Sequence, residues 1–281
     1  MKIILSYRGI TDKPGWATGD MVARAMRFHG HQVFCYGNYY RTNKRLENPD
    51  GQEFPIEEAD RLLWMECNDG DPQYIPLLDL KCKKAFWDFD SEMHFHFSHM
   101  LSQVFKWNFA ANPAYVDKFP RSHYLPYAVD TTLFYSDSVE RRGVRMLGNK
   151  FPQRQKFCNE VGVILDDSKH TTEYARALRR LKIHLHYYSS GGKDLIVCRP
   201  LETMASGTML LAQKQPALDR IFDDGKDYVS FTDEKDCKAK IDYYMKHDEE
   251  RERIAKSGQD RVLNAHSYLS RTKALLKVIS K

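Results

Sequence analysis

Short apolar runs alternate with amphipathic stretches along the first half of the chain. Residues 2–7 (KIILSY) are mostly apolar, which predicts a buried strand. In residues 18–30 (TGDMVARAMRFHG) the apolar positions recur at helical spacing, which predicts an amphipathic helix that ends at Gly30. Further strands are predicted at residues 31–37, 59–67 and 83–90. Alternating strands and helices are typical of a parallel sheet that helices cover on both faces.

The second half repeats this alternation. It opens on residues 144–149 (VRMLGN), and a helix is predicted at residues 152–162. Residues 171–188 predict a helix followed by a strand, and residues 233–263 predict two helices with Gly258 as an interruption. A second α/β unit is therefore expected after the first.

The segment of residues 131–145 is polar and charged, and it is the predicted linker between the two units. We predict an N-terminal domain of residues 1–135, a C-terminal domain of residues 136–265, and a C-terminal helix of residues 266–281 that packs back on the first domain. Two α/β units of similar size leave a cleft between them, which is a common place for ligands.

Composition narrows the class of protein. With 281 residues, of which 42% are hydrophobic, the chain is long enough for two folded domains. The apolar runs are too short to span a bilayer, and the first residues do not resemble a signal peptide. Six scattered cysteines without a C-x-x-C pair indicate reduced thiols rather than a disulfide framework or a zinc knuckle. A cytoplasmic protein without a membrane span is expected.

Charge and aromatic residues are unevenly distributed. Residues 1–140 carry a net charge of −4 and residues 141–281 a net charge of +9. All four tryptophans, Trp16, Trp64, Trp87 and Trp107, lie in the acidic first half. This division predicts that the second half binds an anionic ligand and the first half an uncharged or stacking one, with chance clustering of solvated charges as the alternative.

The stretch CRPLETMASGTMLLA (residues 198–212) combines features of an anion site. Pro200 suits the first turn of a helix, and Gly207 suits its end. Arg199 beside the free N–H groups of a helix N-terminus predicts a phosphate site, and the carboxylate of Glu202 could accept hydrogen bonds from ribose hydroxyls. The alternative is an ordinary helix start with a surface arginine.

Several stretches, in order, resemble one enzyme family. They are HYLPYAVDTTLF (123–134), GNKFPQRQKF (148–157), EYARALRRLKIHLHYYS (173–189), CRPLETMASGTMLL (198–211) and the segment of residues 223–268. They resemble the CgeB-like branch of the GT-B glycosyltransferases, related to the large retaining group of nucleotide-sugar enzymes. The resemblance is specific over residues 123–268 and weak over residues 1–122. It implies two Rossmann-like domains whose parallel sheets face across a cleft, with a nucleotide sugar bound mainly to the second domain and the acceptor to the first.

The resemblance also implies roles for individual residues. Asp194 and Glu202 keep the eight-residue spacing of two carboxylates that contact the donor sugar and the nucleotide ribose, with Asp in place of the commoner Glu at the first position. Arg199 matches a basic residue near the diphosphate. The other expected phosphate contacts are Gly148, Lys150 and Arg154. Cationic side chains and a helix dipole can neutralise a leaving diphosphate, so neither a metal nor another cofactor is expected.

The first half contributes weaker candidates. Gly15, Thr18 and Gly19, in GWATGD, follow the first predicted strand and begin a helix, where glycine allows close approach of a phosphate or sugar. This is not the G-x-G-x-x-G pattern, which disfavours a dehydrogenase. Asp88 and Asp90 end a predicted strand, where one could orient an acceptor hydroxyl or act as a base, or both could cap loops.

Histidines offer a further, weaker signal. The segment of residues 94–99 offers His94, His96 and His99. Alternating histidines on a strand share a face, which would allow a metal site, but no carboxylate or cysteine pattern accompanies them, which favours packing or acceptor contacts. His184 and His186 are expected at a strand end near the nucleotide.

The function predicted from the sequence is therefore metal-independent, retaining transfer of a sugar from a nucleotide-sugar donor to a carbohydrate or another hydroxyl acceptor. A nucleic acid with a modified base is an alternative acceptor, against which the acidic first half argues. A non-catalytic module that binds a nucleotide or sugar is a second alternative.

Overall fold

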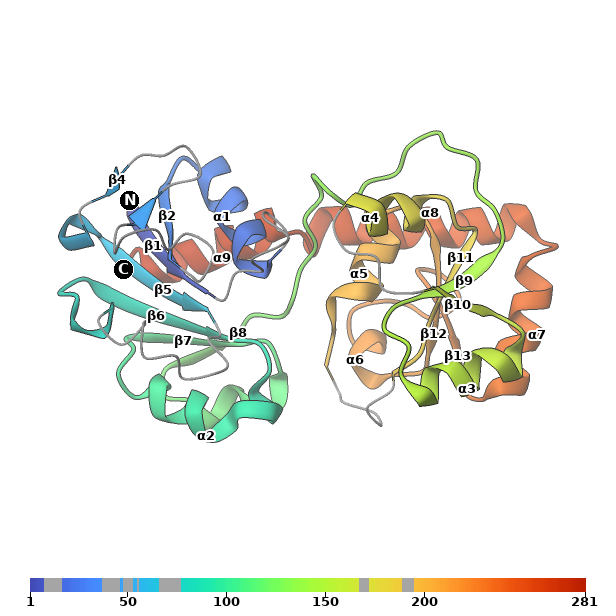
Figure 1. Cartoon of the computed structure of the whole chain (residues 1–281), viewed down its shortest axis with the longest axis horizontal. Coiled ribbons are helices and arrows are strands. Elements are labelled where there is room, and N and C mark those ends of the chain that lie inside the picture. Colours follow the sequence, from blue (N-terminus) through green and yellow to red (C-terminus); the bar gives the residue numbers. More distant parts are fainter. Residues whose placement is uncertain are drawn as a thin grey trace. The chain divides into compact units, whose positions relative to one another are not determined.

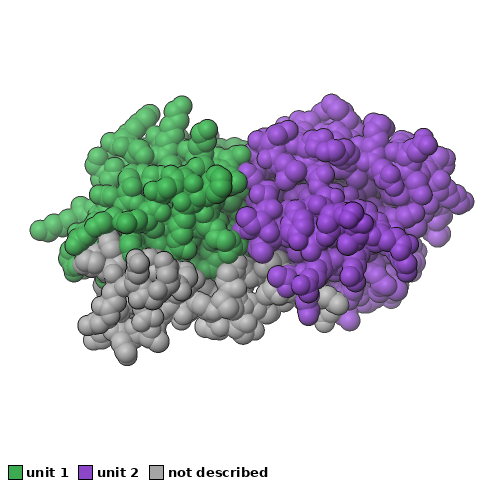
Figure 2. Space-filling view, turned by 90° about the horizontal axis from the view of Figure 1, so that it is seen from above, with its two compact units in different colours: residues 1–127, 268–281 green, residues 128–267 purple. Residues whose placement is uncertain are grey.

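The computed structural model describes residues 1–7, 17–36, 46–47, 53–54, 56–65, 77–166, 172–188 and 195–281. The chain divides into two compact units (Figure 2): unit 1 contains residues 1–127 and 268–281, and unit 2 contains residues 128–267. Both chain ends therefore belong to unit 1 (Figure 1). The predicted residues Gly15 and Asp194 lie outside the described residues.

Unit 1 is built on a parallel sheet with the strand order β2-β1-β5-β6-β7-β8. The strands are β1 (Lys2–Ser6), β2 (Gln32–Tyr36), β5 (Arg61–Met65), β6 (Lys83–Asp88), β7 (Trp107–Ala110) and β8 (Ser122–Tyr124). Two short strands, β3 (Leu46–Glu47) and β4 (Glu53–Phe54), form an antiparallel pair. The central strands are buried on both faces, as expected of a parallel sheet between helices.

Helices cover both faces of this sheet (Figure 1). They are α1 (Thr18–Phe28), α2 (Ser91–Ser102) and α9 (Tyr268–Ile279). Helices α1 and α9 pack against each other, so the C-terminal segment completes unit 1. Leu101 and Phe105, at the end of α2 and beyond it, join strand residues such as Ile4 and Phe86 in one apolar cluster.

Unit 2 has a parallel sheet with the order β10-β9-β11-β12-β13. Its strands are β9 (Val144–Leu147), β10 (Ile164–Asp166), β11 (Ile183–His186), β12 (Met209–Gln213) and β13 (Val229–Phe231). Its helices are α3 (Pro152–Val161), α4 (Thr172–Arg179), α5 (Cys198–Ala205), α6 (Pro216–Asp219), α7 (Glu234–Tyr244) and α8 (Asp248–Ala265). Helices α3 and α7 pack together, whereas α5 packs against both α4 and α8 (Figure 1).

The predicted α/β class with two parallel sheets is confirmed, but two local predictions are wrong. His94, His96 and His99 lie in helix α2, not on a strand. Gly258 lies inside the continuous helix α8, and the break between the last two helices of unit 2 falls at residues 245–247 instead. Within the described residues, none of the helices combines the length and apolar character needed to cross a bilayer.

Candidate functional site

The strand order of unit 2 reverses between β9 and β11. From β9 the chain moves outward to β10, then crosses back to β11 on the other side. In open parallel sheets, ligands bind beyond the carboxyl ends of the strands at such a reversal, because the flanking loops diverge there. Gly148 follows β9 directly and Tyr187 follows β11, so both lie at this point.

Two arginines meet over Gly148. Arg154 belongs to the first turn of α3 and Arg199 to the first turn of α5. A Cβ atom on Gly148 would lie 3.3 Å from an Nη atom of Arg154 and 3.7 Å from Nε of Arg199. The missing side chain therefore gives both guanidiniums room beside the backbone.

Neither guanidinium forms an ion pair within the described part of the chain. Arg154 Nε donates to the Tyr187 carbonyl over 3.4 Å, while the buried Nε of Arg199 has no hydrogen-bond partner there. Burial, together with the positive charge of Arg199, lowers the pKa of Arg154. Two neighbouring like charges, on the buried Arg154 and the half-buried Arg199, favour a bound anion, which would relieve their repulsion.

A buried histidine joins the two elements that carry Gly148 and Arg199. Nε2 of His184 accepts a hydrogen bond from the Leu147 backbone N–H (3.2 Å), which leaves the proton on Nδ1. Nδ1 then donates to Oγ1 of Thr203 (2.7 Å), which in turn donates to the Arg199 carbonyl (2.8 Å). Burial, aided by the charge of Arg199, lowers the pKa of His184 to about 3, so the ring stays neutral and the chain of bonds stays intact.

Glu202 lies one turn after Arg199 on α5 and is partly exposed. Burial raises the pKa of its carboxyl group to about 7, although Arg199 and the hydroxyl of Tyr174 both lower it. A carboxylate beside Arg199 can accept hydrogen bonds from ligand hydroxyls while the two arginines hold an anionic group.

Several buried polar atoms around Arg199 have no partner within the described residues. They are Nε of Arg199, the hydroxyl of Tyr174, Nε2 of His186 and the hydroxyl of Tyr188. The rings of His186 and Tyr188 pack edge-on, with their centroids 4.4 Å apart. Burial lowers the pKa of His186 well below its usual value, and electrostatic interactions with His184 and the two arginines lower it further. Because buried polar groups nearly always have partners, their concentration here indicates a site that a ligand completes.

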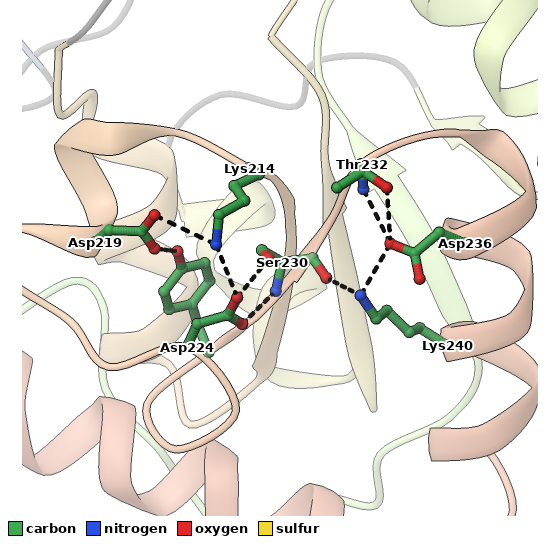
Figure 3. A network of polar contacts seen from close by, with 8 residues as sticks. Lys214, Asp219, Asp224, Ser230, Thr232, Asp236 and Lys240 are labelled. Atoms are coloured by element: carbon green, nitrogen blue, oxygen red, sulfur yellow. Dashed lines mark hydrogen bonds and ion pairs between the residues drawn. The ribbon is translucent and has the colours of Figure 1, made fainter.

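A second polar network in unit 2 contrasts with this site (Figure 3). Lys214 pairs with Asp219 and Asp224, each over 3.4 Å, and Ser230 donates to Asp224 over 2.5 Å. Lys240 pairs with Asp236 over 2.9 Å on the other side of β13, the strand that contains Ser230. Each cation already has a carboxylate here, so this network holds the ends of β12 and β13 together and requires no ligand.

The structure brings four of the predicted donor-site residues together: Gly148, Arg154, Arg199 and Glu202. Lys150 is exposed in the short segment between β9 and α3. The sequence did not identify Tyr174 or Thr203, which carry no motif and reach the site only through the packing of α4 and α5.

The first-domain glycine candidates have a different environment. Thr18 and Gly19 begin helix α1. A Cβ atom on Gly19 would lie 2.1 Å from the ring of Tyr7, so the close approach at this glycine is made by an aromatic ring of unit 1 itself. The Tyr7 hydroxyl donates to Asp20, which ties the end of β1 to the start of α1.

The two aspartates at the end of β6 and just beyond it also differ from each other. Asp88 is 1% exposed, and its carboxylate accepts hydrogen bonds from Ser91 and, over 2.6 Å, from Ser98 of α2. Burial raises the pKa of Asp88. Asp90 is partly exposed and accepts a hydrogen bond from Tyr127 over 3.2 Å, so it is the more accessible of the two.

The histidines of α2 do not form a metal site with their described neighbours. No group of three or more His, Cys, Asp or Glu side chains suited to a metal ion occurs in the described ranges. Instead, the ring of His99 packs against Phe95 at 5.5 Å, and its Nδ1 lies 3.0 Å from the carbonyl of Lys118.

Residues 134–277, just over half of the chain, match the sequence model of a family described as glycosyl transferase-like. No curated protein sequence matches this chain.

Three solved structures resemble the chain over nearly its full length. An alpha-glucosyltransferase (AGT) in complex with UDP has a TM-score of 0.73 at 11% identity and covers 99% of both chains. HepE from Anabaena, in complex with UDP-glucose, has a TM-score of 0.69 at 10% identity and covers 100% of this chain and 99% of its own. The DNA modifying enzyme beta-glucosyltransferase has a TM-score of 0.68 at 14% identity and covers 100% of both chains. At these identities the likeness concerns the fold, and the predicted GT-B fold is confirmed.

Proposed function

Because this chain belongs to the glycosyl transferase-like family and is a glycosyltransferase, we propose that it transfers a sugar from a UDP-sugar to an acceptor hydroxyl, with retention of configuration and without a metal ion. The observation that carries this proposal is the pair of guanidiniums over Gly148, Arg154 and Arg199, which form no ion pair within the described residues. UDP and UDP-glucose in the solved structures of similar fold support the choice of nucleotide. Membership in a family of enzymes also sets aside the non-catalytic alternative.

The geometry suggests how the donor is held and activated. The diphosphate lies against the two guanidiniums and the N-terminus of α5, and the ribose hydroxyls donate to Glu202. When the bond between the anomeric carbon and the diphosphate oxygen breaks, negative charge develops on the diphosphate. The two arginines stabilise that charge in place, because His184 and Thr203 fix the backbone that positions Arg199. Asp194 contributes a donor-sugar contact in this proposal on the strength of the sequence resemblance alone.

We expect the protein to hydrolyse or transfer from a UDP-sugar equally well with EDTA present, because fixed cations replace the metal at the leaving group. A panel of UDP-, GDP- and ADP-sugars, incubated with and without EDTA and followed by nucleotide release, tests this. The anomeric configuration of the product, read by NMR, tests retention. Activity that EDTA abolishes and Mg²⁺ restores would show that the metal-free mechanism is wrong.

For the acceptor we propose an uncharged compound such as a carbohydrate, because residues 1–140 carry a net charge of −4. The second candidate is a modified base in DNA, supported by the fold shared with a DNA modifying enzyme. We expect binding of oligosaccharides to change little between low and moderate salt, whereas a polyanion would lose affinity by roughly one power of salt concentration per phosphate contact. Tight, steeply salt-dependent binding of hydroxymethylated DNA or tRNA in a parallel titration would favour the nucleic acid instead.

A further inference from the structure

A pocket of about 260 Å³ in unit 2 lies away from the pair of arginines at Gly148. Two of its lining residues place it at the amino ends of the central strands: Lys182 directly precedes β11, and Gly207 comes two residues before β12. Gly148 and Tyr187 instead follow the carboxyl ends of β9 and β11. The four residues of β11 separate these two edges of the sheet by roughly 13 Å, at about 3.3 Å per residue. The pocket is therefore distinct from the candidate donor site.

The lining of this pocket is basic. Its charged side chains are four cations, Arg141, Lys182, Arg251 and Lys256, and one carboxylate, Glu252. The cations come from three parts of the chain: the segment before β9, the residue before β11, and helix α8. The fold, rather than a local run of basic residues, therefore gathers this positive charge.

Arg141 is partly buried and bonded only to neutral oxygens. Its Nη1 donates to Oγ1 of Thr208 (2.8 Å) and to the carbonyl of Leu181 (3.4 Å), and its Nη2 donates to the carbonyl of Ser206 (2.8 Å) and to Oγ of Ser136 (3.1 Å). It forms no ion pair with the described residues. Burial lowers the pKa of Arg141, but an arginine keeps its proton in proteins. The result is a positive charge that four hydrogen bonds hold in place and that no carboxylate neutralises directly.

The other cations of the pocket are paired with carboxylates that lie outside its lining. Lys182 (3.2 Å) and Arg251 share Asp248, and Lys256 pairs with Asp260. Both of these carboxylates are exposed. Ion pairs that reach into solvent contribute little to stability, so the two lysines can turn to a bound anion at small cost.

Gly207 leaves open space on one side of the pocket. Its φ of +68° favours glycine, and a Cβ atom here would lie 2.7 Å from Oγ of Ser136 and 3.0 Å from Nη2 of Arg141. Ser136 accepts a hydrogen bond from Arg141, which leaves its own hydroxyl proton available to a ligand. The pocket thus offers a hydroxyl donor next to the Arg141 charge.

We propose that this pocket is a second anion site, which binds the phosphate group of a small molecule. Lys182, Lys256 and the Ser136 hydroxyl donate to the phosphate oxygens, while Arg141 supplies fixed positive charge beside them. Pockets for drug-sized ligands measure roughly 300–1,000 Å³, so this volume suits inorganic phosphate or a small phosphorylated compound rather than a whole nucleotide sugar. The inference does not depend on the identity of the donor.

The test is a titration of the ¹⁵N-labelled full chain with inorganic phosphate at constant ionic strength, followed by NMR. The backbone amides of Gly207 and Ala255 report on the pocket, and that of Gly148 reports on the candidate donor site. We expect saturable shifts at Gly207 and Ala255. A parallel titration with a hexose monophosphate separates the two sources of the phosphate group: tighter binding identifies a phosphorylated compound, and equal affinity identifies free phosphate.

The double variant Lys182→Gln, Lys256→Gln removes the two lysines without disturbing the bonds of Arg141. We expect it to weaken phosphate binding at Gly207 and Ala255 about ten-fold, the usual effect of losing a charged hydrogen-bond donor, and to leave the response of Gly148 unchanged. The matched control is Lys226→Gln, Lys238→Gln, which removes the same charge from two exposed lysines of unit 2 that also pair with carboxylates. It should leave phosphate binding at Gly207 and Ala255 unchanged.

Three results would overturn the inference. The first is the absence of saturable shifts at Gly207 and Ala255, and the second is equal weakening in the control variant. The third is a shift of these amides by a DNA duplex but not by phosphate or the hexose monophosphate, which would make the pocket part of a polyanion-binding surface. Each of these results leaves the proposed sugar transfer at the other edge of the sheet untouched.

Discussion

Arg199→Ala is expected to lower the turnover number for sugar transfer by about 100- to 1000-fold, the usual cost of removing one preorganised group that stabilises developing negative charge. The charge develops on the departing diphosphate, and Arg199 lies beside Arg154 over Gly148, where that group is proposed to bind. The Michaelis constant for the donor should rise less, because Arg154 and the N-terminus of α5 remain to bind the ground state. Steady-state kinetics with the UDP-sugar identified by the donor panel measure both constants.

The expected loss of turnover in Arg199→Ala should not arise from misfolding. The Arg199 side chain forms no hydrogen bond or ion pair in the described part of the chain, and its charge repels that of Arg154, so its removal breaks no such bond there and relieves a repulsion. We expect a melting temperature no lower than that of the wild type. Arg199→Lys keeps the charge but not the planar fork, and should retain intermediate activity.

Arg142→Ala is the control for this substitution, because Arg142 is exposed and paired with Glu140 away from the strand ends of the site. Its turnover should match that of the wild type. A turnover number for Arg199→Ala within three-fold of the wild type would remove Arg199 from the reaction and leave residues 198–205 as an ordinary helix start.

The local pattern of apolar and polar residues was enough to predict the two sheets and part of the candidate site. Short, mostly apolar runs such as residues 2–7 are typical of buried strands in a parallel sheet, and the carboxyl ends of such strands meet at one edge. Arg199 and Glu202 could be predicted because they share a single helix turn. Gly148 and Arg154 depended on the family resemblance, since no short-range pattern joins them to α5.

Contacts between distant segments could not be predicted in this way. His184, Thr203 and Leu147 form one chain of hydrogen bonds, although they belong to three separate elements. The apolar and histidine alternation at residues 94–99 suited a strand, but Ser91 and Ser98, about two turns apart on a helix, bond Asp88 instead. Alternation over six residues is too short to decide between these structures when tertiary contacts favour one of them.

Helix propensity could not predict the place of Gly258 within α8 either. Glycine weakens a helix by about 1 kcal/mol relative to alanine, so it was expected to interrupt one. In the structure α8 runs through this position, and a Cβ atom here would lie 2.2 Å from the backbone carbonyl oxygen of Asp227 and 3.0 Å from Sδ of Met204. Close packing of α8 on its neighbours therefore requires a residue without a side chain.

Asp227 cannot easily move away from such a Cβ atom. Its carboxylate accepts hydrogen bonds from Ser257 (2.6 Å), from Arg261 (2.7 Å) and from the backbone N–H of Asp223 (3.0 Å). Two of these donors lie on α8 itself, one on each side of Gly258. Any shift that relieves the clash would stretch bonds to the same helix.

We therefore expect Gly258→Ala to lower the free energy of unfolding by about 3 kcal/mol, a typical cost of overpacking against fixed backbone that outweighs the gain in helix propensity. For a unit of this size the melting temperature should fall by roughly 10 °C. Thermal unfolding followed by circular dichroism measures this, with Arg253→Ala, an exposed position on the same helix, as the control expected to stay within about 0.5 kcal/mol. A melting temperature at or above that of the wild type would mean that α8 can shift away from Asp227, and that helix propensity rather than packing governs this position.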